Sequence, residues 1–247
     1  MISFFEEFPN QPNLQKLSLL HFPAKLYLAA ESVNEFQRIV STIKNRNIKE
    51  FIYWPLLKRK EGYWISPFSE RKALVRIFKE LEIEKVPVML DLELPTTQNP
   101  LLYLTQSSLF LGNKKLIRKF INDYRGKIYL AEYYPEGKWR EKLLKLLGLH
   151  YWSKKVKVIK MLYRSLHHFN DDFLREELRR GKREYGDDFI AGLGVIAPGI
   201  QGDEPILSPQ QLEQDLQIAQ KAGIKEVILF RLGGLDERYG KVLKKFR

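Results

Sequence analysis

The chain repeats one pattern, a short apolar segment followed by an amphipathic helix or a loop. Eight such segments are apolar at both parities, which is typical of strands covered on both faces. They span residues 2–8, 25–30, 50–57, 86–94, 127–134, 156–164, 188–197 and 226–232. Because a helix or loop separates each strand from the next, with no reversal, we expect the strands to run parallel.

Two of the expected helices begin with capping sequences. Ser32 with Glu35 forms a capping box before one apolar stripe, and Ser208 with Gln211 forms another. The second helix is expected to stop at Gly223. Similar patterns predict helices at 69–81, 113–126 and 170–181.

The strand count favours closure into a (β/α)8 TIM barrel that spans residues 1–247 as a single domain. Such a barrel needs about 250 residues, and the chain has 247, of which 44% are hydrophobic and 13% aromatic. An open, doubly wound sheet is the alternative. The first strand is not followed by a GxGxxG or GxxxxGK phosphate loop, which makes a nucleotide-binding open sheet less favoured.

Composition excludes several kinds of site. The chain has no cysteine, which excludes disulfides, thiolate metal sites and a cysteine nucleophile. The four histidines, at 21, 150, 167 and 168, show no HxH or HExxH spacing, and no GxSxG elbow occurs. We therefore expect a site that uses neither a metal nor a cofactor.

The charge of the chain is its weakest functional signal. A net charge of +12 and a pI near 9.6 permit electrostatic attraction to nucleic acid, anionic polymers or membrane surfaces. A solvated helix face explains the same residues, as in 138–147, so nucleic acid is a less favoured partner. No apolar stretch suits a membrane helix and the N-terminus resembles no signal peptide, so we expect a cytoplasmic protein with no membrane partner. The sequence does not indicate an oligomeric state.

The fourth predicted strand carries two acids, Asp91 and Glu93. Residues two apart in a strand project from the same face, with α-carbons about 6.5–7 Å apart. Burying two carboxylates is costly unless they are hydrogen-bonded, paired or protonated, and their proximity should push their pKa values apart. One acid then suits general acid catalysis while the other stays ionised. The alternative is an ion pair with a nearby arginine or lysine.

Other strand ends supply further candidates, because this fold places its chemistry at the carboxyl ends of the strands. Glu132 is expected to pair with Glu93 or to hold a sugar hydroxyl. The alternative is that it forms an ion pair with a basic neighbour. Strand alternation lets only one of Glu6 and Glu7 face inward, and the sequence does not indicate which. Glu7 is the substrate-binding candidate of the pair. Tyr163, at the end of the sixth strand, adds a hydroxyl.

Aromatic side chains cluster near the same strand ends. Flat rings with polar tips suit sugar rings, and they also suit ordinary packing. The expected substrate-binding aromatics are Tyr53, Trp54 and Tyr133, with Tyr63, Trp64 and Tyr134 nearby.

The last strand ends in a glycine-rich segment. Gly233 and Gly234 are expected to bind phosphate through backbone N–H groups, with Arg231 as the counter-charge. A tight strand-to-helix turn explains the same glycines.

Two strands resemble those of family 18 glycoside hydrolases, the chitinases and related endoglycosidases. Met89-Leu90-Asp91-Leu92-Glu93 is similar to their DxDxE signature, and Met161-Leu162-Tyr163-Arg164 to their MxYD strand. The resemblance implies that Glu93 protonates the glycosidic oxygen while Asp91 and Tyr163 hold an acetamido group. Met89, Arg164 and Phe230 replace the first aspartate, the aspartate after the tyrosine and a strand-eight tryptophan.

Three hypotheses follow. The first is a metal-free, glycosidase-like barrel that cleaves or binds a glycan, with Glu93 as general acid and Asp91 or Glu132 as its partner. The second is a phosphate-binding lyase, isomerase or synthase that uses the loops after strands seven and eight. The third is a non-catalytic protein that binds RNA or another anionic polymer through its charge.

Overall fold

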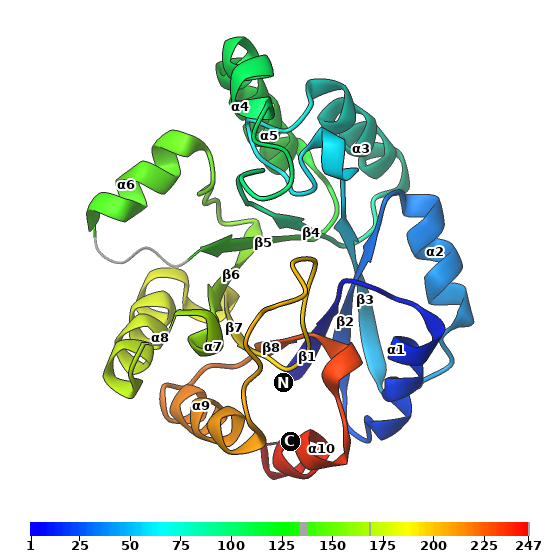
Figure 1. Cartoon of the computed structure of the whole chain (residues 1–247), viewed down its shortest axis with the longest axis vertical. Helices are drawn as coiled ribbons and strands as arrows, with labels where there is room; N and C mark the ends of the chain where they lie inside the picture. Colours follow the sequence, from blue (N-terminus) through cyan, green and yellow to red (C-terminus); the bar gives the residue numbers. More distant parts are fainter. Residues whose placement is uncertain (134–137, 168, 247) are drawn as a thin grey trace. The chain divides into compact units, whose positions relative to one another are not determined.

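The computed structural model describes residues 1–133, 138–167 and 169–246, so Tyr134 and His168 lie outside the described residues. Eight strands close into a barrel in chain order (Figure 1), which confirms the predicted (β/α)8 fold. The strands are β1 (Ile2–Glu6), β2 (Ala24–Ala30), β3 (Ile48–Pro55), β4 (Val88–Asp91), β5 (Ile128–Tyr133), β6 (Val156–Leu162), β7 (Phe189–Val195) and β8 (Val227–Phe230). The fourth strand ends at Asp91, so Glu93 follows the strand instead of lying in it.

Helices separate the strands as the sequence pattern predicts. The longer ones are α2 (Val33–Thr42), α3 (Arg71–Glu84), α5 (Phe110–Asp123), α6 (Lys138–Leu147), α8 (Asp171–Tyr185), α9 (Pro209–Lys221) and α10 (Glu237–Leu243). Short helices are α1 (Gln11–Gln15), α4 (Leu102–Thr105) and α7 (Arg164–His167). In the described parts of the chain, no helix is both long and apolar enough to cross a bilayer.

The two predicted caps differ in completeness. Ser208 and Gln211 exchange both bonds of a capping box at the start of α9. At α2, the Glu35 N–H donates to Ser32 Oγ, 3.2 Å away, but the Glu35 carboxylate accepts from the Glu31 N–H instead. The Glu35 carboxylate therefore binds the N–H of the residue before Ser32, and not the N–H of Ser32 itself as a capping box requires.

Contacts group the chain into two compact units, which we describe separately. The first comprises Met1–Ala29, Arg38–Ile52 and Ile159–Arg247. Here the rings of Tyr163 and Phe230 lie 5.9 Å apart, and those of Phe230 and Phe5 lie 6.3 Å apart. The strands β6 and β8 are not neighbours in the barrel, so the contact between Tyr163 and Phe230 passes through its interior. Phe5 therefore faces the interior, and Glu6 faces the opposite side by strand alternation.

The second unit comprises Ala30–Gln37 and Tyr53–Val158. The ring of Tyr53 packs 5.3 Å from that of Phe36 on α2, so Tyr53 faces the helices. Because Tyr53 pairs with Val88, the side chain of Val88 points the same way. Strand alternation then directs Asp91 of β4 toward the barrel interior.

Candidate active site

Asp91 and Glu93 lie at the carboxyl end of β4. Asp91 is the last strand residue and is buried. Glu93 is half-buried and accepts a 3.0 Å hydrogen bond from the hydroxyl of Tyr133, the last residue of β5. Asp91 pairs with Ala131, so Tyr133 projects from the same interior face as Asp91. The two strands thus bring two acids and a tyrosine, itself 39% exposed, to one side of the sheet.

The loop after β3 braces this strand end. The Ile65 N–H donates to the backbone oxygen of Asp91 at 2.9 Å, and the Ser69 hydroxyl donates to the oxygen of Trp64 at 2.7 Å. The rings of Tyr63 and Trp64 are buried and meet edge to face at 5.2 Å. These two aromatics therefore hold the loop together rather than offering a free sugar platform.

Glu61, at the start of that loop, is fixed by Arg76 of α3. The guanidinium binds both carboxylate oxygens, at 3.0 and 2.9 Å. These hydrogen bonds hold the pKa of Glu61 below its usual value, so it is an anchor for the loop.

Glu132 lies on the other side of the sheet. It follows Ala131, the partner of Asp91, so its side chain points away from the interior. Its fully buried carboxylate contacts His150 Nδ1 at 2.8 Å and accepts from the Tyr151 N–H at 3.3 Å. The structure therefore does not place Glu132 beside Glu93, and the alternative of a basic neighbour describes its position.

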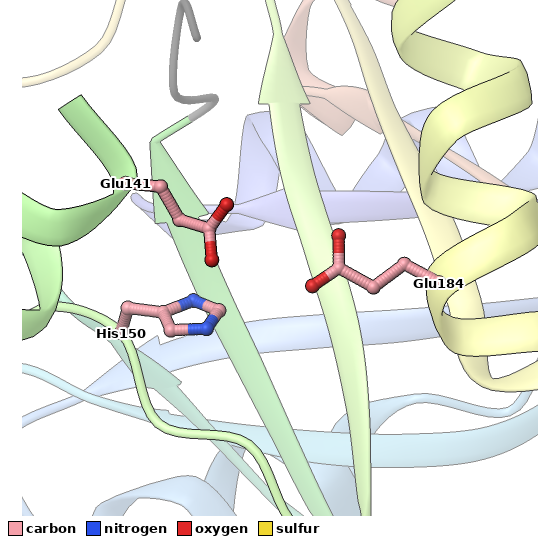
Figure 2. A group of neighbouring side chains, drawn as sticks. All are labelled: Glu141, His150 and Glu184. Carbon is pink, nitrogen blue, oxygen red and sulfur yellow. The ribbon is translucent and has the colours of Figure 1, made fainter. Parts of the chain in front are cut away.

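His150 is the residue that the sequence analysis missed. It follows α6, and its ring nitrogen and a carboxylate oxygen of Glu141 lie within 4.8 Å of one another (Figure 2). Glu184, the third residue drawn there, belongs to α8 in the first unit. The contact of His150 with Glu132 spans 18 residues, and no motif spacing indicates it.

The two β3 aromatics point in opposite directions. Tyr53 is fully buried against Phe36, so the structure does not bring it to the interior face. Burial is the main reason that the pKa of Tyr53 is raised. Trp54 projects from the opposite side by alternation and is 3% exposed.

In the first unit, Glu6 is enclosed by donors. Its Oε1 accepts from the Phe8 N–H at 2.8 Å, Asn13 Nδ2 at 3.2 Å and Arg231 Nη1 at 3.0 Å, and its Oε2 accepts from the Gly233 N–H at 2.7 Å. Burial raises the pKa of Glu6, whereas Arg231 and the N–H groups oppose that rise. This carboxylate holds the loop after β8 and the start of α1 in place.

Glu7 is the inward-facing member of the Glu6–Glu7 pair. A Cβ added to Gly199 would lie 2.9 Å from Glu7 Oε2 and 2.9 Å from Cζ of the interior residue Phe230. Only glycine leaves room for the carboxylate at this point. Glu204 closes the loop after β7 by accepting from the N–H groups of Gly199 and Gly202, each at 3.0 Å.

The donors of the expected phosphate site have partners within the protein. The Gly233 N–H and Arg231 both serve Glu6, and the Gly234 N–H donates to the backbone oxygen of Arg231 at 3.1 Å. Arg231 Nε also donates to the backbone oxygen of Pro198 at 2.8 Å. The donors that would bind a phosphate are thus already used inside the protein.

Tyr163 and Arg164 separate at the end of β6. Tyr163 is buried in the interior, and a Cβ on Gly192 would lie 3.5 Å from its ring. Arg164 instead binds Asp171 of α8 at 2.6 Å and Asp215 of α9 at 3.2 Å. Burial raises the pKa of Asp215 to about 6. Arg164 is therefore part of an ion-pair group between helices.

Comparison with known proteins identifies the fold. No family model matches the chain, and no match was found among curated protein sequences. The PgaB (BpsB) glycoside hydrolase domain from Bordetella bronchiseptica is similar in structure, with a TM-score of 0.57, 11% identity and coverage of 99% of this chain and 97% of that one. A chitinase from Chromobacterium violaceum has a TM-score of 0.56 and 9% identity, with coverage of 100% of this chain and 98% of that one. D-psicose 3-epimerase, solved in the presence of D-fructose, has a TM-score of 0.53 and 12% identity, with coverage of 99% of this chain and 97% of that one. At these identities the likeness describes the (β/α)8 fold.

Proposed function

We propose that this chain acts on a glycan by carboxylate acid–base chemistry, with Glu93 as general acid. The observation that carries the proposal is the group formed by Asp91, Glu93 and Tyr133. It lies at the carboxyl ends of two adjacent strands, where barrels of this fold place their catalytic groups. Two solved structures with this fold are a glycoside hydrolase domain and a chitinase, and a third is a sugar epimerase, which supports the substrate class.

The roles follow from exposure. Glu93 is the less buried of the two acids, so its carboxyl group can meet a substrate, and Tyr133 orients it through the 3.0 Å hydrogen bond. The proton of Glu93 passes to the glycosidic oxygen as the bond to the anomeric carbon breaks. Asp91 then either activates a water molecule or attacks the anomeric carbon itself. The first route inverts the anomeric configuration. In the second route, water deprotonated by Glu93 then breaks the bond between Asp91 and the sugar, and the two successive inversions retain the configuration.

Exposed aromatic surface supports the same substrate class. Tyr133 is 39% exposed and lies beside Glu93, so its ring can stack on a sugar while its hydroxyl holds the acid. Within the second unit, Trp54 remains a proposed substrate contact, because it lies on the side of β3 opposite to Tyr53. Glu7 and Tyr163, which face the interior within the first unit, remain proposed substrate contacts of that unit. Tyr53, predicted as a substrate contact, faces the helices, and Glu132, predicted as a catalytic partner of Glu93, contacts His150, so the proposal uses neither.

The experiment compares the wild type with Glu93→Gln on a panel of chitin, xylan and β-glucan oligomers. We expect one class to raise the melting temperature of both proteins, because ligand binding stabilises the folded state. The wild type should release reducing ends, and Glu93→Gln should release them at least about 100-fold more slowly.

Glu82→Gln is the matched control, since Glu82 is an exposed acid on α3, and it should match the wild type. Equal rates for wild type and Glu93→Gln would contradict the assigned role of Glu93. If no oligomer of the panel changes the melting temperature, the proposal that the chain binds a glycan is contradicted.

A further inference from the structure

Exposed apolar side chains are concentrated in one stretch of the chain. Of the twelve large apolar side chains exposed in the described residues, nine lie between Leu101 and Trp152, within the second unit. An exposed apolar patch marks an interaction site more often than scattered single residues do, so the arrangement of these side chains on their helices matters.

The helix α6 shows the pattern most clearly. Trp139, Leu143 and Leu146 are spaced four and three residues apart, so they form one stripe along the helix. Their exposed fractions are 73%, 36% and 66%. An amphipathic helix normally turns its apolar stripe toward the core. Here Leu144 and Leu147 are partly buried instead, and the stripe faces outward.

The end of α6 is joined to the start of α5. Lys114 Nζ donates to the backbone oxygens of Lys145 and Leu146, at 2.7 and 2.8 Å. Leu111 lies one turn before Lys114 on α5 and is 69% exposed. Trp152, which is 54% exposed, follows α6. We call the residues Leu111, Trp139, Leu143, Leu146 and Trp152, together with the exposed Arg140 and Lys142 of α6, the basic apolar surface.

The charge of the chain is concentrated in the same stretch. Residues 110–155 contain twelve lysines and arginines against four acids, a net charge of +8 out of the chain's +12. Arg140 and Lys142 are exposed on α6 itself, next to the stripe. Apolar residues that include tryptophan and leucine, bordered by basic ones, are the features of a helix that lies in the headgroup region of an anionic bilayer.

We propose that the basic apolar surface docks the protein on an anionic lipid bilayer, with α6 lying in the headgroup region. The leucines argue for lipid over nucleic acid, because bases stack on aromatic rings and an aliphatic side chain offers them no stacking surface. The net charge of +8 argues against a second copy of the chain joined through the same surface, because like charges would face each other. A bilayer offers both anionic headgroups and an apolar layer beneath them.

The test measures binding of the full chain to vesicles of equal parts phosphatidylcholine and phosphatidylglycerol, with pure phosphatidylcholine vesicles alongside. We expect sedimentation with the anionic vesicles that weakens as salt is raised, because salt screens the charge contribution. The double variant Leu143→Ser, Leu146→Ser should bind at least about tenfold more weakly, since each leucine contributes several buried methylenes. Its melting temperature should fall only slightly, because Leu146 is 66% exposed and Leu143 is 36% exposed.

Ile83→Ser is the matched control. Ile83 is an aliphatic residue on α3 that is 75% exposed and lies outside the stretch 101–152, so its loss should leave vesicle binding unchanged. Tryptophan fluorescence gives a second readout. Trp54 and Trp64 are buried and Trp139 and Trp152 are exposed, so a blue shift on adding vesicles should diminish in Trp139→Phe, Trp152→Phe.

Three results would overturn the proposal. The first is a lack of binding to the anionic vesicles. The second is equal binding by the wild type and the double leucine variant. The third is a wild-type dimer that the leucine substitutions dissociate, or an oligothymidine complex that they weaken, because either would assign the surface to another partner.

Discussion

Nδ1 of His150 lies 2.8 Å from Oε2 of Glu132, and both side chains are almost fully buried. Replacing His150 by alanine removes this contact of the buried Glu132 carboxylate, whereas the hydrogen bond from the Tyr151 N–H remains. We expect the free energy of unfolding to fall by about 3 kcal/mol, because removing one partner of a buried pair costs the hydrogen bond that the other partner made to it. Chemical denaturation measures the change. His21→Ala alters an exposed histidine and should change little.

The ion pair of Glu6 and Arg231 predicts a difference between arginine and lysine. Arg231 donates to both Glu6 and the backbone oxygen of Pro198, which a single ammonium group cannot do in the same geometry. Arg231→Lys should therefore lower the free energy of unfolding by about 2 kcal/mol. Arg238→Lys, at an exposed pair with Asp236, should have almost no effect. Equal losses in the two variants would show that the Glu6 contacts do not depend on the guanidinium.

Gly234 and Gly240 form a matched pair of substitutions to alanine. A Cβ on Gly234 would lie 1.8 Å from the backbone oxygen of Ile196, whereas a Cβ on Gly240 would meet no atom within 4 Å. Gly234→Ala should lower the free energy of unfolding by more than about 3 kcal/mol or prevent folding. Gly240→Ala, inside α10, should raise it by about 0.5–1 kcal/mol. Thermal unfolding of both variants tests the prediction, and a stable Gly234→Ala protein would contradict it.

Asp215 predicts how stability changes with pH. Its folded pKa of about 6 lies above the ordinary aspartate value of 3.8, chiefly because burial disfavours the charged form. A raised pKa means that its stabilising contribution is complete below the unfolded value and is lost as the pH rises through about 6. Between about pH 4 and pH 7, the stability of the wild type relative to Asp215→Asn should fall by about 2 kcal/mol. Denaturation of both proteins across this range measures the slope, and a rise with pH would contradict the prediction.

The barrel could be predicted from the sequence because its strands are apolar at both parities and its helices carry caps. Strand ends were harder to place. The fourth strand was expected to continue to residue 94 but ends at Asp91, and Pro95, which lacks an N–H to donate, follows shortly after.

The candidate site could be predicted only where it depends on strand alternation. Spacing of two residues predicts Asp91 and Glu93 on one face of a strand, but β4 ends at Asp91. Glu93 is instead related to the interior face through the hydrogen bond from Tyr133. Alternation alone could not tell which face of β5 carries Glu132, because that depends on the register between β4 and β5. Contacts between distant residues, such as Glu204 with the N–H groups after β7, leave no periodic signal in the sequence.

The enclosure of Glu6 has an evolutionary consequence. Gly233, Arg231 and Asn13 together form an anion cradle, and the protein fills it with a carboxylate of its own. Shortening that one side chain to glycine would empty the cradle while leaving its donors in the chain. A barrel of this kind is thus one substitution away from a vacant binding site for a small carboxylate. Formate or acetate added to Glu6→Gly should restore part of the stability that the substitution removes.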